Sequence, residues 1–135
     1  MSGEVSMIGS VEHMAIAAKD TAGLARWYVD KLGFEVQVDG GEKGIWFVGP
    51  PGNGALLEII PASDAARGTR ARNDAGWSHL AFTVADVKAA YEALKAKGIT
   101  FTAEPREQAG GSWLAFFSDG EGNDLQIIQR PTALR

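Results

Sequence analysis

The sequence predicts an α+β fold made of two βαβββ modules that form a curved mixed sheet. One observation behind this is an internal repeat, in which HMAIAAKD (13–20) matches HLAFTVAD (79–86). In addition, the Asp that ends each copy is followed by a helical stretch that ends in Gly. Finally, ALLEII (55–60) is similar to NDLQII (123–128). A single domain over 1–135 is expected, with module one at about 8–62, a polar linker at 63–75 and module two at about 76–131.

The first strand of each module separates two kinds of side chain, because neighbours on a strand alternate between faces. One face carries a histidine followed by small residues: His13, Ala15 and Ala17 in module one, and His79, Ala81 and Thr83 in module two. The opposite face is more apolar: Met14, Ile16 and Ala18, then Leu80, Phe82 and Val84. We expect the apolar faces to pack under the helices, which leaves a second face lined by small residues.

Aspartates open both predicted helices. Asp20 and Asp86 can accept hydrogen bonds from the free amides of a helix's first turn. Gly33 and Gly98 stand where a helix end favours a residue that tolerates positive φ. Each helix is therefore expected to run between its Asp and the Gly that follows.

Aromatic residues mark a strand after each helix. The segment GIWFV, around Trp46, is similar to GSWLAFF, around Trp113. These tryptophans are therefore expected at matching positions of the repeat. A Gly-Asn pair at 52–53, and again at 122–123, predicts a turn near each hairpin connection.

Each closing strand carries one polar residue among apolar ones, Glu58 in module one and Gln126 in module two. Alternation puts both on the face opposite to their apolar neighbours, such as Leu57 and Leu125. An unpaired buried polar group costs on the order of a few kcal/mol, and a charge costs more. Something should therefore offset the charge of Glu58, and a divalent cation would do so.

A metal site is the sharpest interpretation of these positions. The candidate ligands are His13, Glu58, His79 and Gln126, which a curved sheet would bring together. Imidazole nitrogens with carboxylate and amide oxygens suit Zn²⁺, Ni²⁺, Co²⁺, Mn²⁺ or Fe²⁺. Each histidine taken alone would more often be a hydrogen-bonded structural residue, but their matching places in two repeats favour the metal.

Composition narrows the class of protein. The chain has 135 residues, a formal charge of −4 and no cysteine, with an isoelectric point near 5.1. The acidic balance disfavours nucleic acid and anionic membranes, which are bound first through clustered Lys and Arg. Without cysteine there is no disulfide, thiolate metal site or cysteine nucleophile. No signal peptide or membrane span is evident, so a cytoplasmic location is expected.

Three arginines cluster in one short stretch, at Arg67, Arg70 and Arg72. A solvated loop is one interpretation, because charge runs are usually surface features. The other is a loop that meets an anionic ligand.

These residues resemble the vicinal oxygen chelate superfamily, which includes glyoxalase I, bleomycin resistance proteins, extradiol dioxygenases and methylmalonyl-CoA epimerase. The resemblance covers nearly the whole chain. It rests on the His that opens each module, the Asp-capped helix, Trp27-Tyr28 followed by LGF (32–34), and the closing turn DGEGNDLQIIQ (119–129).

The resemblance implies a cup of paired modules around a divalent metal, a small-molecule ligand and a homodimer. His13, Glu58, His79 and Gln126 stand where glyoxalase-like members place their ligands. The last of these is usually a Glu in glyoxalase I, where it acts as a base as well. Gln126 departs from that pattern, because an amide can coordinate through oxygen but cannot take up a proton at neutral pH.

Several functions stay open. The first is a metal-dependent lyase or isomerase with Glu58 as base, acting on a molecule with vicinal oxygens or an acidic C–H beside a carbonyl. An alternative is a metal-free binding protein of the bleomycin-resistance type, in which an aromatic or amphipathic molecule lies among Trp46, Trp77 and Trp113. An epimerase or a dioxygenase is a further alternative. The resemblance assigns specificity to loops such as 37–44, 62–76 and 103–111.

Overall fold

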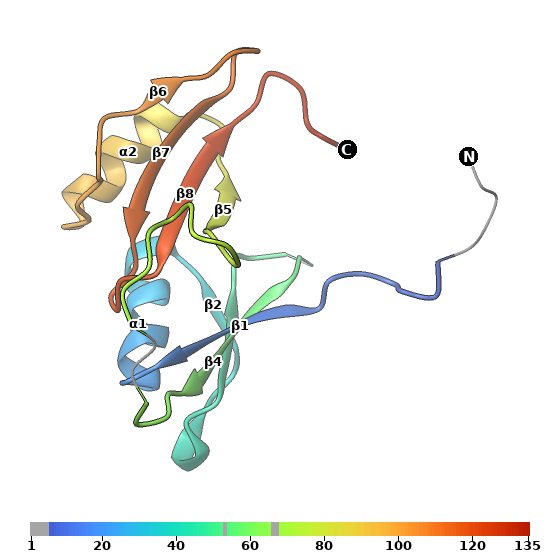
Figure 1. Ribbon diagram of the computed structural model, residues 1–135, viewed down its shortest axis with the longest axis vertical. Helices are drawn as coiled ribbons and strands as arrows, with labels where there is room; N and C mark the ends of the chain where they lie inside the picture. Colours follow the sequence, from blue (N-terminus) through green and yellow to red (C-terminus); the bar gives the residue numbers. More distant parts are fainter. Residues whose placement is uncertain (1–5, 53, 66–67) are drawn as a thin grey trace. The chain divides into compact units, whose positions relative to one another are not determined.

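The computed structural model of the chain describes residues 6–52, 54–65 and 68–135. These residues fall into two compact units (Figure 1). The first unit runs up to Val29 and includes Gly33–Ala62, and the second comprises Ser63–Arg135 with Asp30–Leu32. The chain thus passes from one unit to the other at the start of the expected linker. The assignment of both units to one domain stays a prediction.

The first unit is built on a four-stranded sheet with the strand order β1-β4-β3-β2. Strand β1 is parallel to β4, and the remaining neighbours are antiparallel. A short 3-10 helix, η1, leads into β3. The elements are β1 His13–Ala18, α1 Thr21–Leu32, β2 Glu35–Val38, η1 Gly41–Lys43, β3 Trp46–Gly49 and β4 Leu56–Pro61.

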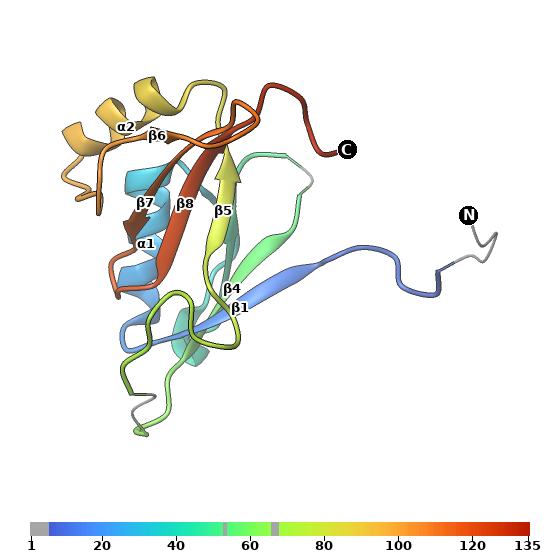
Figure 2. The ribbon, with the colours of Figure 1, turned by 45° about the horizontal axis from the view of Figure 1, so that its top comes forward.

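The second unit repeats this connectivity in the order β5-β8-β7-β6 (Figure 2). Strand β5 is parallel to β8, and helix α2 packs against β7 and β8. Its elements are β5 Leu80–Thr83, α2 Val87–Ala96, β6 Arg106–Glu107, β7 Trp113–Ser118 and β8 Asp124–Gln129. The predicted α+β fold of two βαβββ modules is confirmed, with one mixed sheet in each unit.

The helix boundaries follow the predicted caps. The side chain of Asp20 accepts from the amide of Gly23 at 2.9 Å, and Asp86 accepts from Ala89 at 3.1 Å. Helix α1 ends at Leu32 and is capped by Gly33, which has a φ of 72°. Helix α2 ends slightly earlier than expected, at Ala96, and the positive φ follows at Gly98.

One face of each sheet forms the core. In the first unit Val48, Leu57 and Ile59 are between 0% and 3% exposed, and in the second Phe117, Leu125 and Ile127 are too. Full burial of such side chains contributes roughly 1.5–3 kcal/mol each. The histidine face of each first strand is open, since Ala15, Ala17, Ala81 and Thr83 are all exposed. In the described part of the chain, neither helix is long and apolar enough to cross a membrane.

The second predicted turn is present before β8. Gly122 has a φ of 90°, and the amide side chain of Asn123 donates to the Asp119 carboxylate at 2.8 Å. The first Gly-Asn pair includes Asn53, which lies outside the described residues.

Candidate functional site

In the first unit, His13 and Glu58 come together on neighbouring strands. Ala15 is paired with Glu58 in the parallel ladder of β1 and β4, and His13 lies two residues before Ala15 on the same face. The Nε2 atom of His13 is 3.5 Å from Oε1 of Glu58. Their side chains are 36% and 21% exposed, so both can meet a ligand from the open face.

The residue before His13 contacts its ring. Nδ1 of His13 lies 2.8 Å from Oε1 of Glu12. An ionised carboxylate only accepts hydrogen bonds, so Nδ1 carries the proton and donates it. Nε2 of His13 is then left next to the Glu58 carboxylate, where a proton or a metal ion between the two atoms would be held by both.

The second unit repeats this relationship. Ala81 is paired with Gln126 in the ladder of β5 and β8, so His79 stands to Gln126 as His13 stands to Glu58. Nδ1 of His79 is 2.8 Å from the hydroxyl oxygen of Ser78, the preceding residue. Gln126 is only 6% exposed. Its amide side chain makes no hydrogen bond with any residue that the structure describes, which leaves its oxygen available to a ligand.

A phenylalanine contacts each histidine edge-on. The rings of His13 and Phe47 have centroids 5.5 Å apart at 90°, and those of His79 and Phe116 are 5.1 Å apart at 87°. Phe47 is paired with Glu58 and Phe116 with Gln126. The repeat therefore extends to a trio of histidine, phenylalanine and Glu or Gln in each unit.

The expectation that Trp46 and Trp113 occupy matching positions is wrong. Trp46 pairs with Ile59, whose counterpart Ile127 pairs with Ala115. Trp113 lies two residues earlier on β7 and pairs with Gln129. Aligning the two segments on their tryptophans therefore gave the wrong equivalence. The equivalent positions of β3 and β7 are those that pair with equivalent residues of the closing strands β4 and β8.

Neither of these tryptophans lies on the face of Glu58 or Gln126. Directly paired residues share a face, so Trp46 lies on the side of the buried Ile59. Trp113 shares the side of α2, where Nζ of Lys88 lies 4.1 Å from its ring centroid. The strand registers do not support the expectation that both line a ligand pocket beside the candidate metal ligands, and that expectation stays a prediction. Trp77, two residues before His79, is 85% exposed and is open to a ligand or partner.

Four site residues were absent from the sequence-based prediction: Glu12, Ser78, Phe47 and Phe116. A signal for the first two was present, because each directly precedes a repeated histidine. The phenylalanines could be aligned only once the strand registers were known.

The residues present can be tested against a metal ion. No group of three or more His, Cys, Asp or Glu suited to a metal occurs within the described residues. The candidate ligands instead occur as two pairs, one in each unit: His13 with Glu58, and His79 with Gln126. The convergence of the two pairs stays a prediction.

Comparison with known proteins shows the family. A model described as Glyoxalase/Bleomycin resistance protein/Dioxygenase superfamily matches residues 10–127. The uncharacterized protein YurT of Bacillus subtilis (strain 168) is 34% identical over 122 residues, which cover 86% of this chain and 95% of that protein. A superfamily member from Sphaerobacter thermophilus DSM 20745 superimposes with a TM-score of 0.74, at 27% identity, covering 93% of this chain and 100% of that one.

Solved structures with lower sequence identity share the fold, and their names indicate different functions. A lactoylglutathione lyase from Agrobacterium tumefaciens has a TM-score of 0.69 at 17% identity, covering 92% of this chain and 96% of that one. TnmS3, an antibiotic binding protein from Streptomyces sp. CB03234, has a TM-score of 0.72 at 22% identity, covering 93% and 99%. The fold alone therefore does not separate catalysis from binding. With its paired βαβββ modules and the family match over 10–127, the chain belongs to the Glyoxalase/Bleomycin resistance protein/Dioxygenase superfamily.

Proposed function

We propose that the protein is a divalent-metal-dependent enzyme of the glyoxalase type, a lyase or isomerase. Its substrate would be a small molecule with vicinal oxygens or an acidic C–H next to a carbonyl. The observation that carries this proposal is the pair of His13 and Glu58, with Nε2 and Oε1 3.5 Å apart on the open face of the sheet.

This separation suits two ligands of one ion. Nitrogen and oxygen ligands lie about 2.0–2.2 Å from zinc, so two of them on a tetrahedral ion are about 3.4 Å apart. The contact between Glu12 and His13 adds support, because metal-binding histidines commonly donate their other N–H to a carboxylate or another acceptor. Ser78 offers its hydroxyl to His79 in the same way. His13, Glu58, His79 and Gln126 would hold Zn²⁺, Ni²⁺, Co²⁺, Mn²⁺ or Fe²⁺ according to availability.

A bound ion would supply polarisation of the substrate's oxygen atoms. The chain itself would supply the base. Glu58 is the one carboxylate of the ligand set, and we assign it the proton taken from carbon. Gln126 would bind through its amide oxygen and stay neutral. The proposed reaction therefore uses a single base, on the side of the first unit.

A metal-free binding protein is the second candidate, and the antibiotic binding protein TnmS3 shares the fold. The strand registers count against the aromatic cradle expected for this role. Trp46 and Trp113 lie on the faces opposite to Glu58 and Gln126, which leaves Trp77 as the exposed tryptophan of the three.

Metal content separates the two candidates. Protein purified without chelators is analysed by plasma mass spectrometry beside His13→Ala and His79→Ala, with Arg130→Gln as a matched surface control. The enzyme proposal expects a stoichiometric transition metal in the parent and control that is lost in both histidine variants. A folded parent that contains no metal, and takes up none on dialysis against Zn²⁺ or Ni²⁺, favours the binding protein.

A further inference from the structure

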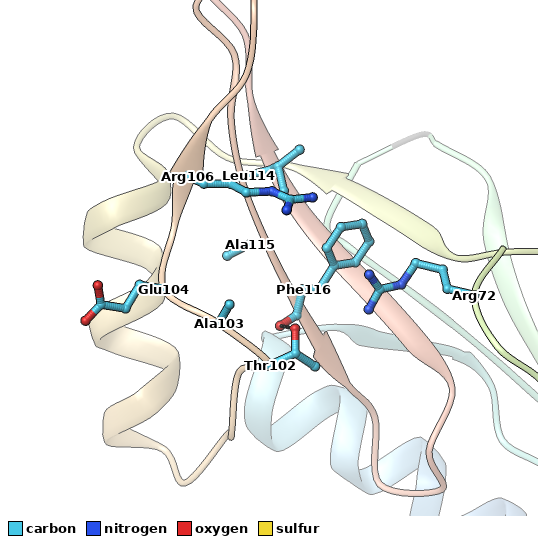
Figure 3. A pocket seen from close by; sticks show the side chains of 8 residues that line it. All are labelled: Arg72, Thr102, Ala103, Glu104, Arg106, Leu114, Ala115 and Phe116. Carbon is cyan, nitrogen blue, oxygen red and sulfur yellow. Dashed lines mark hydrogen bonds between the residues drawn. The ribbon is translucent and has the colours of Figure 1, made fainter.

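The second unit contains a cavity of about 70 Å³ that involves two arginines (Figure 3). A single water molecule needs a cavity volume of roughly 10–15 Å³, so this cavity can hold a polar group larger than one water. Arg72, Arg106, Thr102, Leu114 and Phe116 contribute to its wall.

The cavity opens on the face of Gln126. Arg106 is paired with Leu114, which puts both side chains on one side of the sheet. Phe116 follows Leu114 by two residues on β7 and is paired with Gln126. The same phenylalanine contacts His79. The cavity is thus next to the pair of candidate ligands that the second unit supplies.

Arg72 is held in place while most of its donors remain uncommitted. Its guanidinium carbon lies 3.6 Å from the centroid of the Phe116 ring, so the flat face of the group is used for stacking. The Nε atom is buried and has no hydrogen-bond partner in the described structure. The terminal nitrogen is 3.8 Å from the Asp124 carboxylate, which is too long for a hydrogen bond. No hydrogen bond within the described residues therefore occupies the N–H edge of the group.

Arg106 is also uncommitted. Across the described residues, no hydrogen bond or ion pair engages its guanidinium. In Figure 3 the side chains of Arg72 and Arg106 extend toward the Phe116 ring, whereas the carboxylate of Glu104 extends away from them. Two positive groups that face one cavity repel each other unless an anion lies between them.

The arginine cluster of the sequence separates into different roles. Arg70 donates to the carbonyl oxygens of Asp74 and Ala75, both at 3.1 Å, and so shapes its loop. Arg67 lies outside the described residues. Arg72 fits the second interpretation of the cluster, a loop residue that meets an anionic ligand.

We propose that the second unit binds an anionic group, a carboxylate or a phosphate, between Arg72 and Arg106. The planar N–H edge of arginine matches both groups through paired hydrogen bonds. This site does not depend on the metal. If the proposed function holds, the anionic group belongs to the substrate and anchors it beside Gln126.

Binding can be followed at Arg72 itself. The buried Nε–H should give a resolved signal in ¹H–¹⁵N NMR spectra of the full chain. The probes are inorganic phosphate, malonate as a carboxylate, and malonamide as a neutral control, all at constant ionic strength set with sodium chloride. We expect saturable shifts of the signal with phosphate, malonate or both, and none with malonamide. The stronger of the two anions identifies the preferred group.

Matched variants test the assignment. Arg106→Gln changes an exposed residue, and Arg130→Gln removes the same charge from the same unit outside the cavity. Loss of one charged hydrogen-bond partner should weaken binding at least about tenfold in Arg106→Gln. Arg130→Gln should bind like the parent. Arg72→Gln should be as weak as Arg106→Gln, read from backbone amides of β7, and Arg106→Gln keeps the test valid if Arg72→Gln does not fold.

The outcomes are distinguishable from those of the metal proposal. Anion binding should persist in His13→Ala, which retains the whole cavity. Equal binding by the parent and Arg106→Gln, or shifts that do not saturate with either anion, would overturn the proposal even if the metal is found.

Discussion

Nε2 of His13 lies 3.5 Å from Oε1 of Glu58, while Nδ1 of the same ring lies 2.8 Å from Glu12. Each nitrogen of the imidazole thus faces a carboxylate, one at hydrogen-bond distance and one farther away. The shorter contact orients the ring, and the longer one has the spacing of two ligands on one ion. We therefore expect Glu12 to support metal binding indirectly, through the His13 ring, and Glu58 to bind the metal directly.

Glu12→Gln should weaken metal binding without abolishing it. The amide can still accept from Nδ1, but it no longer carries the charge that makes the ring a stronger ligand. A loss of about 10-fold in Zn²⁺ affinity is expected by isothermal titration calorimetry, at the low end of the effect of such supporting groups. Glu42→Gln, an exposed carboxylate in η1, is the matched control. A loss as complete as in His13→Ala would instead make Glu12 a ligand.

Ser78→Ala tests the equivalent contact in the second unit. Removal of the hydroxyl frees the His79 ring from its 2.8 Å contact. Zn²⁺ affinity should fall by about 10-fold, as for Glu12→Gln. Ser78→Thr keeps a hydroxyl and should restore most of the affinity. If Ser78→Ala binds Zn²⁺ as tightly as the parent, the contact between Ser78 and His79 has no role in metal binding.

Gln126→Glu should add a second base to the site. A carboxylate can bind the metal and also take up a proton, whereas the amide only binds. General base catalysis typically contributes about 10²–10⁴-fold, so isomerase activity on the thiohemiacetal of methylglyoxal and glutathione should rise within that range. Initial rates of the metal-loaded variant and parent provide the measurement. Equal inactivity of both would reject this substrate class.

Asp86→Ala should destabilise the second unit through α2. The side chain accepts from the amide of Ala89 at 3.1 Å, and loss of such a cap costs about 1 kcal/mol. Asp86→Asn retains an acceptor and should stay close to the parent. Urea unfolding followed by circular dichroism measures both changes. A loss in Asp86→Asn as large as in Asp86→Ala would show that charge, and not the hydrogen bond, stabilises the helix end.

We also expect a homodimer, with a mass of about twice 14.3 kDa in light scattering coupled to gel filtration. Large apolar side chains are exposed in both units: Ile8 at 79% and Val11 at 67% in the first, and Trp77 at 85% in the second. These side chains would be buried if they gathered into one apolar patch at an interface, since contiguous exposed apolar patches mark interaction sites. Trp77→Ser should shift the equilibrium toward the monomer. A parent that elutes at 14.3 kDa at every concentration would contradict this expectation.

The repeat made most of the fold predictable. His13 and His79, Asp20 and Asp86, and Glu58 and Gln126 recur in one order. Alternation along the strands placed the histidines, Glu58 and Gln126 on a face, and the two aspartates were recognised as helix caps. The residue types carried this information because caps and strand faces are local properties.

Register was the part that could not be predicted. Trp46 and Trp113 look equivalent in the sequence, yet pairing along β3 and β7 separates them by two residues. Strand pairing is set by contacts between distant segments, so a conspicuous residue type is a poor guide to it. The place of Arg106 beside the Arg72 loop was missed for a similar reason. It becomes visible only when β6 is paired with β7 beside the Arg72 loop.

The central claim is that His13 and Glu58 hold one metal ion together. The most direct test is a crystal structure of the zinc-loaded protein with anomalous data at the zinc edge. We predict an anomalous peak about 2.0–2.2 Å from both His13 Nε2 and a carboxylate oxygen of Glu58. A fully loaded crystal whose zinc lies away from these two atoms would contradict the account.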